Sequence, residues 1–274
     1  LKEIKIPPSV ALIDKAAFGS CFSLTKIFIP SEVKTIEDFA FEDCTKLKKI
    51  EFEEKSKLES IGNYSFRNCK SVTEILIPPS VTEIKEGTFT MCSSIENFKF
   101  DLNRLPHLKI DFKKFIFNGC NSIVSITIPS SCTTIESYMF NGCINLHSCF
   151  IPYSVESIED FAFNNCFSLA NVNFPKNLRQ IGKKAFSNCK SLLSVNIPYI
   201  TETIKEYAFD GCSSLDSVNF SNNSLLQRVC DYAFKNCIAL SNINIPFFAS
   251  IGKCVFDGCP KINEVEFDYD KLEW

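Results

Sequence analysis

A phenylalanine followed three residues later by a cysteine recurs along the whole chain, and its spacing constrains the fold more than any other feature. The eleven pairs begin at Phe18, Phe41, Phe66, Phe89, Phe117, Phe140, Phe163, Phe186, Phe209, Phe234 and Phe256. Successive phenylalanines are 23, 25, 23, 28, 23, 23, 23, 23, 25 and 22 residues apart. A fixed period of this size is typical of a solenoid, in which each coil packs on its neighbours.

Within each coil, the apolar positions predict two short strands. Residues three, six and eight after each cysteine are apolar, with Cys149 as the single thiol among them, and the last two alternate as a strand with one buried face does. A second apolar column, of Ile, Val or Phe, stands five residues before each phenylalanine. The residue before the cysteine is Gly in four coils, Asn in four and Asp in one, which predicts a tight corner with a left-handed backbone.

Two stretches carry this pattern most clearly: IPSSCTTIESYMFNGCINL at 128–146 and IPYSVESIEDFAFNNCFSL at 151–169. They resemble the BspA-like class of leucine-rich repeats, and the Asn- and Cys-rich corners favour a protist-type member. The resemblance implies a right-handed, curved solenoid with a parallel sheet on its concave face, and adhesion or protein binding by members that are often surface-exposed. The fold we expect is therefore an α/β leucine-rich-repeat solenoid, mostly β, of about eleven 23-residue coils with short strands and turns on the convex side.

We expect a single continuous solenoid over residues 1–274, belonging to a longer protein because the chain begins in the middle of a coil. The 28-residue interval adds its extra residues after a strand and keeps Phe112 in register, so residues 101–114 are interpreted as an irregular bulge within the solenoid.

Composition argues against several classes of function. A net charge of −3 gives no electrostatic reason to bind nucleic acid or an anionic membrane. No apolar run approaches the ~20 residues of a membrane-spanning helix. The only histidines, His107 and His147, fall in different coils, and phosphate-binding glycine motifs are absent. We therefore predict a protein that is not an enzyme, with no catalytic, cofactor-binding or metal-ligating residues.

The cysteine column has three interpretations. Zinc is disfavoured because no C-x-x-C pair occurs, and disulfides between adjacent coils are conceivable from the ~4.8 Å strand spacing. Side chains in register point the same way, however, so a buried column of small side chains is the favoured interpretation. Cys230 is the thiol we expect to be most exposed, since Glu37 and Gly62 occupy its column elsewhere.

Two positions per strand, five and seven after the cysteine, are predicted to point outward from the concave sheet. In the first four coils they carry five charges in eight positions, and in the next six coils none in twelve. The neutral stretch is interpreted either as a hydrogen-bonded amide ladder or as a surface for a polar partner, and the two are compatible. The predicted partner-binding residues are Phe28, Leu76, Phe150, Asn173, Asn196, Asn219 and Asn244.

These observations favour a non-enzymatic interaction or adhesion module that binds protein or glycan at a cell surface. The alternative is an intracellular scaffold, in which free thiols are natural, or the repeat segment of a larger receptor or signalling protein. Sequons begin at Asn63, Asn219 and Asn222 and matter only in a secreted protein. Exposed end coils predict some self-association.

Overall fold

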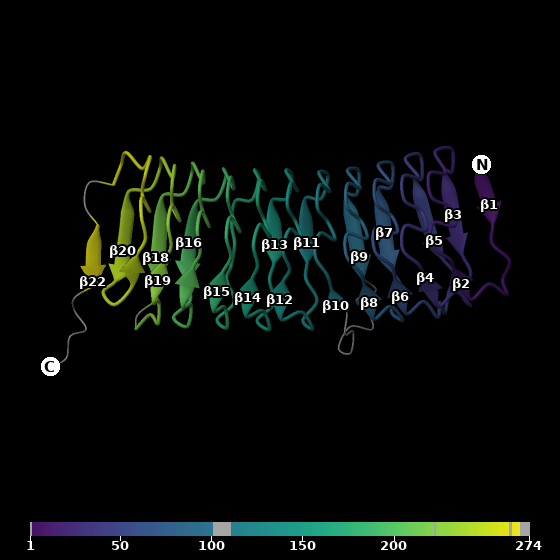
Figure 1. Ribbon diagram of the computed structural model, residues 1–274, viewed down its shortest axis with the longest axis horizontal. Helices are drawn as coiled ribbons and strands as arrows, with labels where there is room; N and C mark the ends of the chain where they lie inside the picture. Colours follow the sequence, from purple (N-terminus) through teal and green to yellow (C-terminus); the bar gives the residue numbers. More distant parts are fainter. Residues whose placement is uncertain (1, 101–110, 222, 263–264, 269–274) are drawn as a thin grey trace. The chain divides into compact units, whose positions relative to one another are not determined.

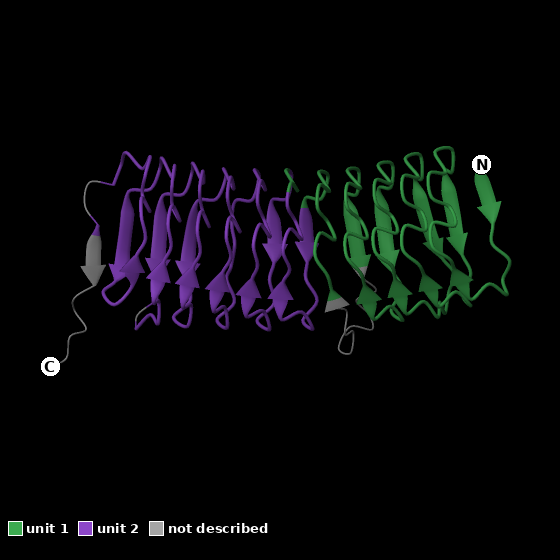
Figure 2. Ribbon diagram, in the orientation of Figure 1, with its two compact units in different colours: residues 1–124, 142–144 green, residues 125–141, 145–274 purple. Residues whose placement is uncertain are grey.

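The structure is a computed structural model that describes residues 2–100, 111–221, 223–262 and 265–268. Most of the predicted bulge at 101–114 lies outside these residues. The chain divides into two compact units, residues 1–124 with 142–144 and residues 125–141 with 145–274 (Figure 2). Each unit is a parallel β-solenoid in which a longer strand and a two-residue strand alternate along the chain (Figure 1). The exception is the coil between β14 and β15, where an isolated bridge of Asn171 with Ser148 stands in place of a longer strand.

In unit 1 the longer strands form a five-stranded sheet and the short strands form another. The longer strands are β1 (Glu3–Lys5), β3 (Lys26–Ile29), β5 (Lys49–Phe52), β7 (Glu74–Ile77) and β9 (Asn97–Phe100). The short strands are β2 (Leu12–Ile13), β4 (Thr35–Ile36), β6 (Ser60–Ile61), β8 (Glu83–Ile84) and β10 (Asp111–Phe112).

Unit 2 repeats this arrangement with its longer strands divided between a two-stranded and a four-stranded sheet. These strands are β11 (Ser125–Thr127) and β13 (Ser148–Phe150), then β16 (Ser194–Ile197), β18 (Ser217–Phe220), β20 (Asn242–Pro246) and β22 (Glu266–Asp268). The short strands are β12 (Thr134–Ile135), β14 (Ser157–Ile158), β15 (Gln180–Ile181), β17 (Thr203–Ile204), β19 (Arg228–Val229) and β21 (Ser250–Ile251). We call the outward side of the longer strands, in either unit, the long-strand face.

The core of each unit is built from identical positions stacked in register. Ile27 of β3 lies opposite Ile50 of β5, and both are buried. The phenylalanines of the repeat stack as well: the ring centroids of Phe41 lie 5.1 Å from those of both Phe18 and Phe66. A single coil has too few apolar side chains to bury itself, so stacking between neighbours supplies the core.

The predicted left-handed corner is confirmed in all eleven repeats. The residue before each cysteine has φ between 56° and 75°, from Ser20 to Gly258. A second left-handed position, two residues before each phenylalanine, has φ between 51° and 62° and was not predicted, because aromatic residues such as Phe39 and Tyr64 occupy it. The free-energy cost of this left-handed backbone is offset by hydrogen bonds to the next coil. The Phe39 N–H donates to the Asn63 carbonyl at 2.9 Å, and the Phe41 N–H donates to the Ser65 carbonyl at 2.7 Å.

Two details of the expected fold are wrong. The described residues contain no helix, so the α/β designation does not hold, because two left-handed residues per coil interrupt any right-handed helical run. The solenoid has about ten turns rather than eleven, because eleven Phe–Cys corners delimit ten intervals. The short strands also form regular parallel sheets, with Ile13 opposite Ile36 and Ile36 opposite Ile61.

Candidate interaction surface

The seven predicted partner-binding residues are all exposed, and all but Asn173 lie on the long-strand face. The exposed fraction is 43% for Phe28, 53% for Leu76 and 65% for Phe150. Phe28 and Leu76 belong to unit 1, where the intervening strand places Glu51 beside Phe28. Phe150 and the four asparagines, Asn173, Asn196, Asn219 and Asn244, belong to unit 2.

Of the predicted amide ladder, the structure shows one hydrogen bond, between Asn219 and Asn196. Asn196 and Asn219 are paired in register, and the Asn219 Nδ2 donates to the Asn196 Oδ1 at 3.0 Å. Asn173 lies outside the assigned strands, and Asn244 is paired with Glu266 rather than with an asparagine. An amide bonded to one neighbour keeps further donors and acceptors, so this row remains able to hydrogen-bond a partner.

The long-strand face of unit 1 carries an internally paired charge cluster. The Lys26 ammonium lies 2.6 Å from the Glu51 carboxylate, which also pairs with Lys49 on its own strand. Hydrogen bonds from Lys26, and then from Lys49, lower the pKa of the Glu51 carboxyl. Charges that neutralise each other in this way are poor anchors for an outside partner, because a partner must replace pairs that already exist.

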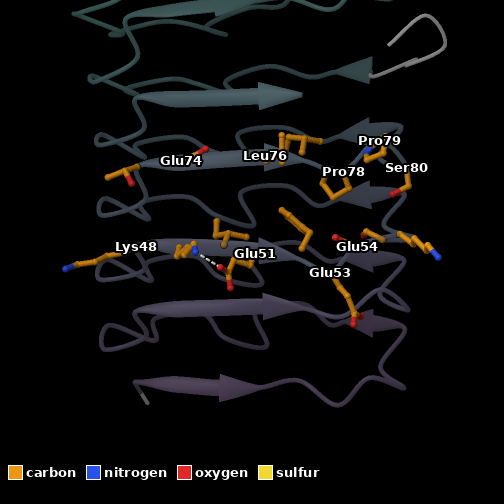
Figure 3. Close-up of a pocket in the computed structure, with 16 residues that line it drawn as sticks. Lys48, Glu51, Glu53, Glu54, Glu74, Leu76, Pro78, Pro79 and Ser80 are labelled. Atoms are coloured by element: carbon orange, nitrogen blue, oxygen red, sulfur yellow. Dashed lines mark ion pairs between the residues drawn. The ribbon is translucent and has the colours of Figure 1, made fainter. Parts of the chain in front are cut away.

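A hollow of about 1010 Å³ lies between β5 and β7, and we call it the β5–β7 hollow (Figure 3). Its lining combines the exposed side chain of Leu76 with Pro78 and Pro79, and carboxylates that include Glu53 and Glu54. Of these residues, only Leu76 was predicted from the sequence to face a partner. The signal that could have identified the hollow is the 25-residue interval followed by two consecutive prolines.

The cysteine column is a ladder of hydrogen-bonded thiols. All fifteen cysteines are free, and the preferred interpretation of a buried packing column is confirmed. Ten thiols, from Cys44 to Cys259, donate to the carbonyl of the phenylalanine one coil earlier, at 3.0 to 3.3 Å. The expectation for Cys230 is wrong: its side chain is buried, whereas Cys254 is exposed and Cys21 is partly exposed.

Burial keeps at least two of these thiols protonated at neutral pH. Desolvation raises the pKa of Cys44 and of Cys143 to about 12. Since the thiolate is the nucleophile and the metal ligand, a thiol that keeps its proton does neither chemistry. No group of three or more metal-ligating side chains is found in the part of the chain that the structure describes. His147 is exposed, and His107 lies outside the described residues.

The asparagine of the first sequon, Asn63, is held by hydrogen bonds to the neighbouring coils. The Asn63 Nδ2 donates to the Asp38 Oδ1 at 3.1 Å, and the Asn63 Oδ1 accepts the Glu86 N–H at 3.1 Å. Ser65, which completes this sequon, is buried. A glycan on Asn63 is therefore incompatible with these contacts between coils, whereas Asn219 is exposed.

The repeat, the parallel strands and the stacked core agree with a comparison to known families. A family described as "BspA type Leucine rich repeat region (6 copies)" matches residues 1–109, 104–216 and 181–273. The chain belongs to this family. A search of curated proteins finds no match to it. No helix in the described ranges combines the length and the hydrophobicity that crossing a membrane requires.

Solved structures of bacterial leucine-rich repeat proteins are similar to this chain. One from Bacteroides ovatus is 27% identical, with a TM-score of 0.61, over 93% of this chain and 82% of that one. One from Eubacterium ventriosum is 26% identical, with a TM-score of 0.56, over 93% and 81%. The pneumococcal vaccine antigen PcpA is 21% identical, with a TM-score of 0.54, over 89% and 68%, and shares the fold alone.

Proposed function

We propose that this protein is a non-enzymatic interaction module whose long-strand face binds a protein or glycan partner. One observation carries the proposal: each coil offers outward side chains at fixed positions on a stacked, buried core, as β16 and β18 do with Asn196 and Asn219. Surfaces preorganised in this way bind at a lower entropic cost than flexible ones. Membership of a leucine-rich repeat family, typically protein-interaction modules, supports the same role.

The neutral face of unit 2 is the proposed partner-binding surface. Amides and hydroxyls supply adaptable hydrogen bonds, and Phe150 adds an exposed ring of the kind that anchors interfaces. Phe28 and Leu76 are proposed as the corresponding anchors in unit 1. Adhesion and exposure at a cell surface are the finer parts of the proposal, and they rest on the resemblance to BspA-like proteins.

A second candidate function is an intracellular scaffold. The fifteen free thiols favour it, because reducing compartments keep cysteines unpaired. Antibody labelling of intact and permeabilised cells that produce the protein separates the two. Labelling of intact cells is expected for an adhesin, and labelling only after permeabilisation removes that proposal and leaves the scaffold.

Photo-crosslinking tests the binding face. With benzoylphenylalanine in place of Phe150, an adduct with the partner is expected, and it weakens when Asn196 and Asn219 are both changed to Asp. The matched control places the same crosslinker at Tyr153, which is 76% exposed but lies outside the strands of the face. Protease digestion of the adduct identifies a protein partner, and glycosidase digestion a glycan. Equal adducts from both positions contradict the proposed face.

A further inference from the structure

In the two coils with a 25-residue interval, the longer strand is only partly paired with the longer strand of the next coil. β5 is paired with β7 only at Lys49 and Glu74, although β3 with β5 and β7 with β9 are paired over four residues. β18, which ends the second 25-residue coil, is likewise paired with β20 at two positions. In both places the incomplete pairing lies between a longer coil and the shorter coil that follows it.

The sequences of the two coils differ just beyond the point where β5 and β7 separate. Nine residues after its cysteine, the longer coil has Glu53, whose backbone N–H donates to the Ile29 carbonyl at 3.0 Å. The corresponding residue of the next coil is Pro78, which has no N–H, and Pro79 follows it. The segment after β7 therefore cannot donate as Glu53 does, and the β5–β7 hollow lies beside it.

The centre of the hollow is apolar. The Leu76 side chain is 53% exposed and lies between Glu74, at one end of the hollow, and Pro78 and Pro79 toward the other (Figure 3). Phe52, partly exposed at the end of β5, adds to the lining. An exposed leucine beside prolines in a concave site is suited to an apolar side chain from a partner.

Four carboxylates and three lysines line the hollow: Glu51, Glu53, Glu54 and Glu74, with Lys48, Lys49 and Lys55. Glu74 and Glu54 are exposed, and no ion pair within the described ranges involves either of them. Glu74 lies opposite Lys49 in register and, after Glu51, contributes electrostatically to the raised pKa of Lys49. Glu53 accepts the Ser31 N–H at 2.7 Å, and this bond lowers the pKa of Glu53, so the carboxylate is held in its charged form near Glu54. Figure 3 shows Lys48 extending away from the hollow, and Lys49 is already paired with Glu51.

We propose that the β5–β7 hollow binds an extended polypeptide segment that carries an apolar side chain between two basic ones. The apolar side chain packs on Leu76 and the prolines, and the two cations meet Glu74 and Glu54. The carboxylates disfavour nucleic acid and acidic glycans by charge repulsion, and a neutral glycan offers them no cation. This assignment rests on the proposed function and names the partner chemistry of its unit 1 surface.

Fluorescence polarisation with three labelled nine-residue peptides tests this assignment on the full 274-residue chain at low salt. The probe has Arg-Gly-Leu-Gly-Arg at its centre, and the two comparison peptides have Glu-Gly-Leu-Gly-Glu or Arg-Gly-Ser-Gly-Arg. Binding of the probe is expected to be at least tenfold tighter than binding of either comparison peptide. The triple variant E54Q/E74Q/L76S is expected to weaken probe binding at least tenfold.

Matched controls separate this site from a general surface effect. Leu193 is 54% exposed outside the strands and Glu96 and Glu156 are exposed elsewhere, so E96Q/E156Q/L193S removes the same groups without touching the hollow. The control variant is expected to bind the probe as the wild type does. The assignment is overturned if both variants bind the probe equally or if the three peptides bind equally well. It is also overturned if spermidine displaces the labelled probe as effectively as the unlabelled probe does at the same concentration. Crosslinking at Phe150 in the triple variant then shows separately whether the proposed function stands.

Discussion

At the scale of single residues, the cysteine of the repeat is selected by two requirements. The site is fully buried and small, and it faces a carbonyl of the previous coil. Cys212, for example, donates its thiol to the Phe186 carbonyl at 3.1 Å. That carbonyl also accepts the Cys189 N–H at 3.1 Å, so the thiol supplies a second, weaker bond. A cysteine meets both requirements because it packs like a small apolar residue and still carries a donor.

Truncation of one such thiol is therefore expected to destabilise the protein moderately. Cys212→Ala leaves a small cavity and removes one bond, which together cost about 1–2 kcal/mol. Urea denaturation followed by circular dichroism measures the change. Cys254→Ala is the control, because its exposed thiol contributes little to packing. A loss at Cys212 no larger than that at Cys254 would contradict the structural role of the ladder.

The buried thiols also predict how stability depends on pH. The pKa of Cys44 and of Cys143 is about 12 in the folded protein, against about 8.5 for an unfolded cysteine. The unfolded chain thus loses these protons first, and the free energy of unfolding falls as pH rises from about 8.5 toward 12. Urea midpoints measured between pH 7 and 9.5 should decrease. The decrease should be smaller in a Cys44→Ala, Cys143→Ala double variant, and an unchanged slope would refute this explanation.

At the scale of elements, an aspartate in the turn of one coil is paired with a glycine in the turn of the next coil. In three coils an aspartate stands three residues before the repeat phenylalanine: Asp38, Asp160 and Asp231. In the coil that follows each of them, a glycine stands four residues before the phenylalanine: Gly62, Gly182 and Gly252. The Asp160 Oδ1 accepts the Lys183 N–H at 2.8 Å, and Asp231 does the same for Lys253. A Cβ on Gly182 would lie 2.5 Å from the Glu159 carbonyl carbon, so the close approach that this bond requires excludes larger residues.

Gly182→Ala is expected to destabilise unit 2 by about 1–3 kcal/mol, because backbone atoms must move to admit the methyl group. Glu37→Ala is the matched control at the same position of a coil that does not follow such an aspartate, and we expect little change there. Urea midpoints of the two variants give the comparison. If alanine is tolerated equally at both positions, the pairing of aspartate with glycine has no energetic basis.

At the scale of the whole molecule, the solenoid design leaves sheet edges exposed. In unit 1, β1 is paired with β3 on one side and has no other strand partner among the described residues. An unpaired parallel edge above a stacked core invites pairing with a second chain. That the two units form one continuous solenoid stays a prediction from the uniform repeat.

Self-association of the 274-residue chain is the prediction at this scale. Sedimentation velocity over a range of concentrations should show dimers or larger species at the highest ones. Ile4→Pro should reduce them, because proline in β1 removes a donor and obstructs edge pairing. The control is Tyr199→Pro, at an exposed site outside the assigned strands where the corresponding residue of the β7 coil is already Pro79. A wild-type chain that stays monomeric at high concentration would refute the prediction.

The sequence by itself determined the parts of this protein that repeat. A period read from Phe–Cys pairs predicted the solenoid, and the apolar columns predicted both strands and their buried sides, because one stacked core imposes the same pattern on every coil. The outward positions of Phe28, Leu76 and Phe150 followed from strand alternation, and all three are exposed.

Only the tertiary structure decided the features that depend on contacts between different coils. The left-handed backbone at Phe39 and Tyr64 runs against local preference and is held by hydrogen bonds to the next coil. Cys230 is buried, although Glu37 and Gly62 stand at its position in other coils. The hollow beside Leu76 lies where a longer coil with Glu53 is followed by one with Pro78, and this difference between neighbouring coils becomes visible only once the register between them is known.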